Sequence, residues 1–175
     1  LEVYDLDRTI REKLGGLPKY AAYLDNPNPQ GQQAIWDKFF LETLTNIDQN
    51  VPRHVFLLVH GTYYRNKRYF SRLNWNLLRK FKPSIIITLI DDAYDIQQKI
   101  AQIESKFKTR SECTFSEAIE WRTVEIMMAD IVSENLYEDM KIPHFVVAIK
   151  HPPETVYRLL FEKWRLVLYI AFPIG

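Results

Sequence analysis

Two apolar runs decide the fold of this chain, HVFLLVHG at residues 54–61 and PSIIITLIDD at residues 83–92. Each is rich in aliphatic side chains and ends in polar residues, as buried β-strands do. A third run of the same kind covers residues 144–149, and helix-like patterns lie between the runs. Apolar strands that alternate with helices predict an α/β fold, a three-layer sandwich whose mostly parallel sheet is covered on both faces.

Helical periodicity accounts for much of the remaining chain. Trp36, Phe40 and Leu44 are among the apolar residues that repeat at three- and four-residue spacing and predict a helix over 32–47. Thr114 and Glu117 have capping-box spacing, so another helix is expected to begin there. Further helices are expected over roughly 71–81, 92–106 and 153–163, and a fourth strand near Leu166.

The composition of the chain argues against several classes of protein. The 23 basic and 22 acidic residues give a net charge of +1, which argues against a generally basic nucleic-acid-binding protein. A lone cysteine, Cys113, rules out an internal disulfide and fits a reducing cytoplasm, where we expect the protein to act. No apolar run approaches the ~20 residues that span a bilayer, so no membrane partner is expected.

The segment 61–82 concentrates positive charge. No acidic residue occurs between Asp48 and Asp91, whereas this segment is basic and aromatic in alternation. Its cations are Arg65, Lys67, Arg68, Arg72, Arg79, Lys80 and Lys82. Such a field beside a strand end predicts an anionic ligand, with phosphate first. The alternatives are a nucleic-acid groove with aromatic stacking and a solvated helix face.

Ligands of doubly wound sheets bind at the carboxyl ends of the strands, which here means His60-Gly61, Asp91-Asp92 and Lys150-His151. His60 is a candidate contact to phosphate or base, or else simply closes its strand. Gly61 lets the backbone turn sharply beside a ligand. Asp91 is a candidate for holding water on Mg²⁺, whereas Asp92 is better explained as a helix cap.

Arg122 lies on a predicted helix that is apolar on both sides of it. A buried arginine needs a carboxylate or a phosphate, so its partner is either a neighbouring glutamate or a bound phosphate. Arg110, with Lys106 and Lys108, belongs to a polar linker that forms either a lid over the ligand or a solvated loop.

The order of these elements over roughly residues 3–160 resembles the adenylate kinase branch of the P-loop nucleoside monophosphate kinases, especially the archaeal type. The resemblance is carried by YDLDRTIR at 4–11, the strand 55–61 that ends in a histidine, KPSIII at 82–87, and Glu120-Trp121-Arg122. It implies a nucleotide-binding, kinase-like transferase domain that uses ATP or another nucleotide with Mg²⁺. Lys99 and Arg110 then fall in the lid region, with Arg122 facing the transferred phosphate.

The chain departs from that family at several positions. No Gly-x-x-x-x-Gly-Lys-Ser/Thr loop occurs in it, Leu58 stands where an acidic residue is expected, and Lys99 stands near an expected arginine. The run 168–174, LYIAFPI, resembles the opening of nucleoside deoxyribosyltransferases. We therefore expect an adenylate kinase-like domain over 1–163, a second domain beginning at 164–175, and a longer natural protein of bacterial defence type.

Two main functions remain open at this point. The first is a nucleotide-binding domain that senses or phosphorylates a nucleotide, with His60, Gly61, Arg65 and Lys99 toward phosphate. The second is a catalytically degenerate scaffold that binds a partner protein or nucleic acid through the 61–82 surface. A kinase acting on RNA or DNA ends is a third reading of the same surface.

Overall fold

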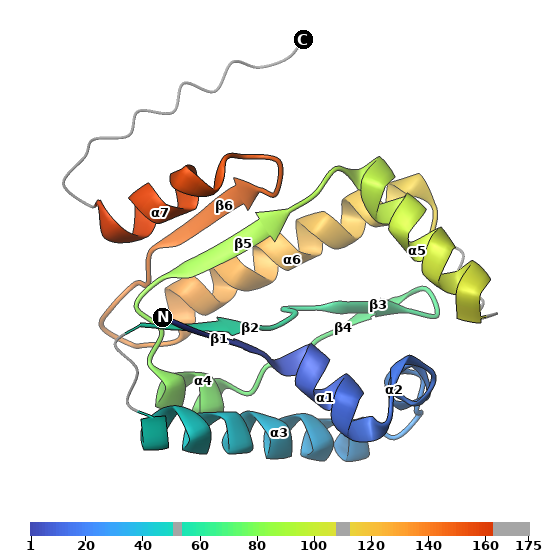
Figure 1. The fold of residues 1–175 in the computed structure, drawn as a ribbon, viewed down its shortest axis with the longest axis horizontal. Coiled ribbons are helices and arrows are strands. Elements are labelled where there is room, and N and C mark those ends of the chain that lie inside the picture. Colours follow the sequence, from blue (N-terminus) through green and yellow to red (C-terminus); the bar gives the residue numbers. More distant parts are fainter. Residues whose placement is uncertain (51–53, 108–112, 163–175) are drawn as a thin grey trace, which may run out of the picture.

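The computed structural model describes residues 1–50, 54–107 and 113–162, and Figure 1 shows their arrangement. Helices and short strands are mixed along these residues. In chain order the elements are β1 (Glu2–Asp5), α1 (Leu6–Leu14), α2 (Leu17–Leu24), α3 (Pro29–Asn50), β2 (Val55–Leu58), β3 (Tyr63–Arg65), β4 (Arg68–Phe70), α4 (Trp75–Phe81), β5 (Ile86–Ile90), α5 (Ala93–Phe107), α6 (Phe115–Asn135), β6 (His144–Ala148) and α7 (Pro153–Phe161).

The strands form three pairs. β1 lies parallel to β2 with Glu2 opposite Val55, and β5 lies parallel to β6 with Ile86 opposite His144. β3 and β4 form an antiparallel hairpin. The four parallel strands run in the same general direction (Figure 1). The α/β class is therefore confirmed, but the expected parallel sheet is present in the described residues as two separate pairs.

The main core lies beneath β1 and β2, among α1, α3, α4 and the end of α6. Trp36 and Phe40 of α3 are fully buried, with ring centroids 4.9 Å apart, and they pack with Leu6 and Ile10 of α1. The apolar stripe read from the sequence is thus the buried face of α3. A smaller cluster joins Tyr64 of the hairpin to Ala118 of α6.

Helix ends follow the expected capping chemistry. Thr114 and Glu117 form the predicted capping box of α6, and Asp92 accepts the Tyr94 amide at the start of α5. The helix expected over 71–81 begins only at Trp75, where Asn74 caps it. The hairpin lies earlier, over residues 63–70, and the sequence reading missed it.

The hairpin turn has an uncommon backbone. Asn66 and Lys67 have φ of 51° and 59°, the left-handed conformation that two-residue hairpin turns require. Asn tolerates this conformation, but Lys is not a typical turn residue there, so the sequence carried little signal. No helix within the described residues has both the length and the apolar character to cross a bilayer. The fourth strand near Leu166 and the second domain over 164–175 fall outside the described residues.

Candidate functional site

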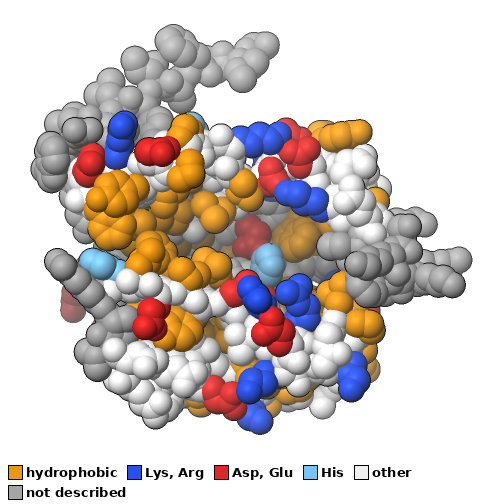
Figure 2. Space-filling model, viewed as in Figure 1, with side chains coloured by type: hydrophobic (Ala, Val, Ile, Leu, Met, Phe, Trp, Pro, Cys, Tyr) orange, Lys and Arg blue, Asp and Glu red, His pale blue; other side chains and the backbone are white. Residues whose placement is uncertain are grey.

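An open groove of about 630 Å³ separates the two parallel pairs. It is lined by successive residues of β2 and its following loop, 57–61, and by successive residues of β5 and its flanks, 85–91. One side of α6 forms part of the lining through Ala118, Trp121, Arg122, Glu125, Ala129 and Val132. Figure 2 shows this hollow with hydrophobic side chains along it and a histidine and acidic side chains toward one end.

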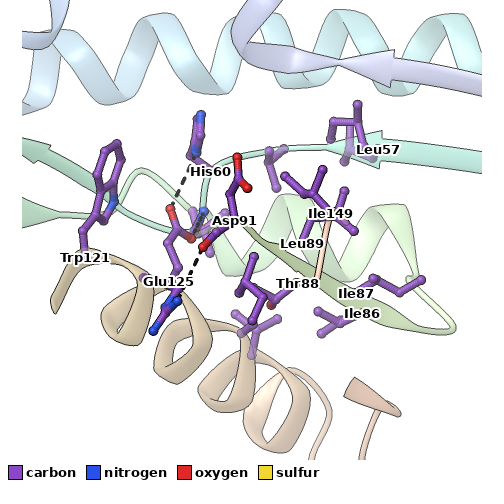
Figure 3. Close-up of a pocket in the computed structure, with 18 of the residues that line it drawn as sticks. Leu57, His60, Ile86, Ile87, Thr88, Leu89, Asp91, Trp121, Glu125 and Ile149 are labelled. Carbon is purple, nitrogen blue, oxygen red and sulfur yellow. Dashed lines mark hydrogen bonds and ion pairs between the residues drawn. The ribbon is translucent and has the colours of Figure 1, made fainter. Parts of the chain in front are cut away.

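The polar end of the groove lies where β2 and β5 end. His60, Asp91, Trp121 and Glu125 gather there from three different elements (Figure 3). This is the edge that the sequence selected, and it brings His60, Gly61, Asp91, Lys99 and Arg122 around one groove. Arg110 lies outside the described residues.

Glu125 holds the turn that follows β2. Its carboxylate accepts the backbone N–H groups of Gly61 at 3.0 Å and Thr62 at 3.1 Å, and it faces His60 Nδ1 at 3.6 Å. A Cβ at position 61 would lie 2.8 Å from Glu125 Oε2, so a larger residue would push the end of this side chain away from the Gly61 amide. Glu125 on α6 therefore fixes the backbone at the carboxyl end of β2.

His60 sits between acidic groups on a partly open surface. Its side chain is 54% exposed, and its ring centroid lies 6.4 Å from that of Trp121. Desolvation opposes protonation, but the hydrogen bond to Glu125 and the charges of Asp7 and Glu125 outweigh it, so the pKa of His60 is raised. His60 is thus biased toward the cationic form, which suits contact with an anion.

Asp7 supports the same turn from the other side. Its carboxylate accepts the hydroxyls of Tyr20 at 2.5 Å and Tyr63 at 2.6 Å, and the amide of His60 at 3.3 Å. Burial, followed by the charge of Asp7, raises the pKa of both tyrosines above the ordinary value. These phenols therefore remain neutral donors, and they hold Asp7 beside the site.

Asp91 is already engaged by protein groups. Lys99 of α5 forms an ion pair with it, and its other oxygen accepts the Asp92 amide at 2.9 Å. The hydrogen bond from Lys99 is the main reason that the pKa of Asp91 is lowered. The described residues contain no group of three or more acidic, His or Cys side chains that would hold a metal ion. A metal site made by the protein alone does not fit these residues.

Arg122 is partly buried at the edge of the groove. Its guanidinium donates to the backbone oxygen of Asp91 at 3.5 Å, a long hydrogen bond. Of the two alternatives that the sequence left open, the glutamate partner is not seen: within the described residues, no ion pair of Arg122 with a carboxylate is present. The charge of Arg122 therefore keeps much of its capacity to bind an anion.

The basic segment is largely tied to other parts of the chain. Arg65 of the hairpin forms an ion pair with Asp25 at 2.6 Å, and it does not line the groove. Lys67, in the hairpin turn, forms an ion pair with Glu117 at 2.6 Å. The Lys67 contact is the largest of several that lower the pKa of Glu117 to about 2. Arg79 donates to the backbone oxygen of Leu136 at 2.8 Å. These three basic side chains thus link secondary-structure elements to one another and do not face a ligand.

The sequence reading did not select two residues of this site, Glu125 and Asp7, as functional candidates. Glu125 follows Arg122 by three positions, so both share one face of α6, and that spacing was available as a signal. Asp7 offered no comparable signal because its three donors come from distant parts of the chain.

Comparison with known proteins adds no assignment. No family model matches the chain, and no match is found among curated proteins. The function must therefore be argued from the site itself.

Proposed function

We propose that this chain is a nucleotide-binding domain of adenylate kinase-like type, which senses or phosphorylates a nucleotide at the carboxyl ends of β2 and β5. One observation carries the proposal: Arg122 lies at the edge of the groove with no carboxylate partner among the described residues. A partly buried arginine in this position is suited to a phosphate group, which its planar guanidinium binds with two hydrogen bonds.

Neighbouring groups complement such a ligand. Trp121 offers an aromatic surface beside His60, and stacking on aromatic rings is a common way to bind a base. Trp121 is held by a hydrogen bond of 3.3 Å from its indole N–H to the Thr62 backbone oxygen. His60 and Lys99 line the same groove as Arg122, but their charges are paired with Glu125 and Asp91, so Arg122 is the main candidate to contact the phosphate.

Within the α/β class, we propose a P-loop NTPase-like fold, with which the arrangement of the strands is compatible. In open α/β sheets the crevice at the carboxyl ends of the strands is the usual ligand site. Mg²⁺ belongs to the proposal only as a companion of the nucleotide, because this ion is commonly held by one or two carboxylates together with phosphates. Asp91 is the candidate carboxylate, and it would have to exchange its ion pair with Lys99 for the ion.

A second candidate function is a scaffold that binds a partner protein or nucleic acid through the 61–82 surface. Arg68, Lys80 and Lys82 are exposed and remain available for it. The pairing of Arg65 and Lys67 with acidic side chains reduces the net charge of this surface. We therefore place the nucleotide site first.

Calorimetric titration with ATP, ADP and AMP in the presence of Mg²⁺ tests the proposal. Loss of a charge-assisted hydrogen bond costs about 1.5–3 kcal/mol, so Arg122→Ala is expected to weaken binding roughly 10- to 100-fold. Arg68→Ala is the matched control, since it removes an exposed arginine from the hairpin. Unchanged binding by Arg122→Ala, or no nucleotide binding by the unmodified protein, would refute the proposed site.

A further inference from the structure

The groove is bordered along its length by the edges of two strands. Side chains of a strand alternate between its two faces, yet all seven residues 85–91 and all five residues 57–61 line the groove. A cavity that contacts every successive residue must lie against the edge of the strand, where the backbone is. The groove therefore separates the edge of β2 from the edge of β5.

The backbone directions of β5 can be assigned. The Ile86 amide donates to Pro143 and the Ile90 oxygen accepts from Ile149, so both groups point toward β6. Because successive peptide groups of a strand point to opposite edges, Ile87 and Leu89 point their N–H and C=O groups into the groove. Within the described residues β5 pairs only with β6, so no ladder uses these groups.

The same reasoning applies to β2. The His54 oxygen accepts the Glu2 amide and so faces β1, which directs the peptide groups of Leu57 and Val59 to the opposite edge. β2 and β5 run in the same general direction on either side of the groove (Figure 1). Two unpaired edges of parallel strands thus face one apolar space, whose lining includes Leu57, Val59, Ile87, Leu89 and Val132.

We propose that one further β-strand fills this groove, runs parallel to β2 and β5, and hydrogen-bonds to both. A strand of about five residues matches β5 in length. Its sequence is a continuous apolar run, because a central strand of a parallel sheet is buried on both faces. The strand joins the two pairs into one sheet of order β1, β2, added strand, β5, β6.

The source of this strand is the same polypeptide, outside the described residues. The position is the centre of the sheet, and open strand edges and exposed apolar side chains there would favour aggregation. Leu58 and Leu89, which line the groove, are 43% and 54% exposed as described. The added strand would end beside His60 and Asp91, so the loop after it would approach the polar end of the groove.

Amide hydrogen exchange of the polypeptide as the cell makes it tests this inference without any nucleotide. We expect the amides of Ile87, Leu89, Leu57 and Val59 to be protected to a similar degree as that of Thr88, which faces β6. Rapid exchange at the four positions, with Thr88 protected, would overturn the proposal. Protection that appears only as protein concentration rises would assign the strand to a second copy and overturn the proposed source.

Proline substitutions give an independent readout. Proline is tolerated at an edge position whose N–H is unpaired, but it breaks a ladder in the centre of a sheet. In the same polypeptide, Ile87→Pro is expected to lower the thermal midpoint nearly as much as Thr88→Pro, and Ile87→Ala controls for loss of the side chain. A midpoint for Ile87→Pro close to that of Ile87→Ala would show that the edge is open and would contradict the added strand.

Discussion

Replacing Glu125 measures how strongly α6 holds the turn after β2. The Glu125 side chain is only 20% exposed, and it accepts two backbone amides, from Gly61 and Thr62. A hydrogen bond to a charged group contributes about 1.5–3 kcal/mol, and the lower part of this range applies because Gly61 is partly open to water that can replace the carboxylate. Loss of the two bonds in Glu125→Ala is therefore expected to lower the free energy of unfolding by roughly 3–4 kcal/mol.

Urea denaturation followed by circular dichroism gives this free energy directly. For a chain of this size the loss corresponds to a fall of about 6–16 °C in the melting temperature. Glu125→Gln retains one acceptor oxygen and is expected to lose about half as much. Amide exchange at Gly61 and Thr62 should accelerate in both variants, because these are the two donors.

Glu134→Ala is the matched control for the helix. Glu134 lies on α6 and pairs with Lys141, but both side chains are more than half exposed, so its loss should cost at most about 1 kcal/mol. If Glu125→Ala costs no more than this control, the two amides are satisfied by water. The turn would then not be held by α6, and the reasoning would fail.

Two further predictions concern the groups around this turn. The raised pKa of His60 means that its ion pair stabilises the fold fully below an ordinary histidine pKa of about 6.5 and is lost as pH rises through the folded-state value. His60→Asn should remove this part of the pH dependence of unfolding, and an unchanged profile between neutral and mildly alkaline pH would exclude the pair. Asp7→Ala leaves two tyrosine hydroxyls without an acceptor and should cost about 2–3 kcal/mol in denaturation, more than the ~1 kcal/mol of Tyr63→Phe. Equal losses in these two variants would show that Asp7 does not organise the tyrosines.

The sequence predicted elements well where local rules and burial agree. The stripe containing Trp36 and Phe40 is the buried face of α3, and Thr114 and Glu117 mark the start of α6 as expected. The hairpin was missed because its turn depends on a lysine at φ of 59°, a conformation that lysine rarely adopts. The helix expected from periodicity covered residues 71–81, after the hairpin, and no element was expected for residues 63–70.

The sequence predicted where the candidate site residues lie better than it predicted which side chains they contact. The rule for strand carboxyl ends selected His60-Gly61, Asp91-Asp92 and Lys150-His151, and of these residues His60, Gly61 and Asp91 line the groove. It did not predict that Arg65 forms an ion pair with Asp25. The charge of Arg65 is therefore used within the protein instead of facing a ligand in the groove. Such pairs join residues 40 positions apart, and only the tertiary structure places them together.

The two parallel ladders bear on how quickly the chain reaches this structure. β1 and β2 pair residues more than fifty positions apart, and so do β5 and β6, whereas the β3–β4 hairpin closes over a few residues. Each distant pairing must overcome the entropy of closing a long loop before its hydrogen bonds can form. Refolding should therefore begin with the helices and the hairpin, and the two parallel ladders should form last and limit the folding rate.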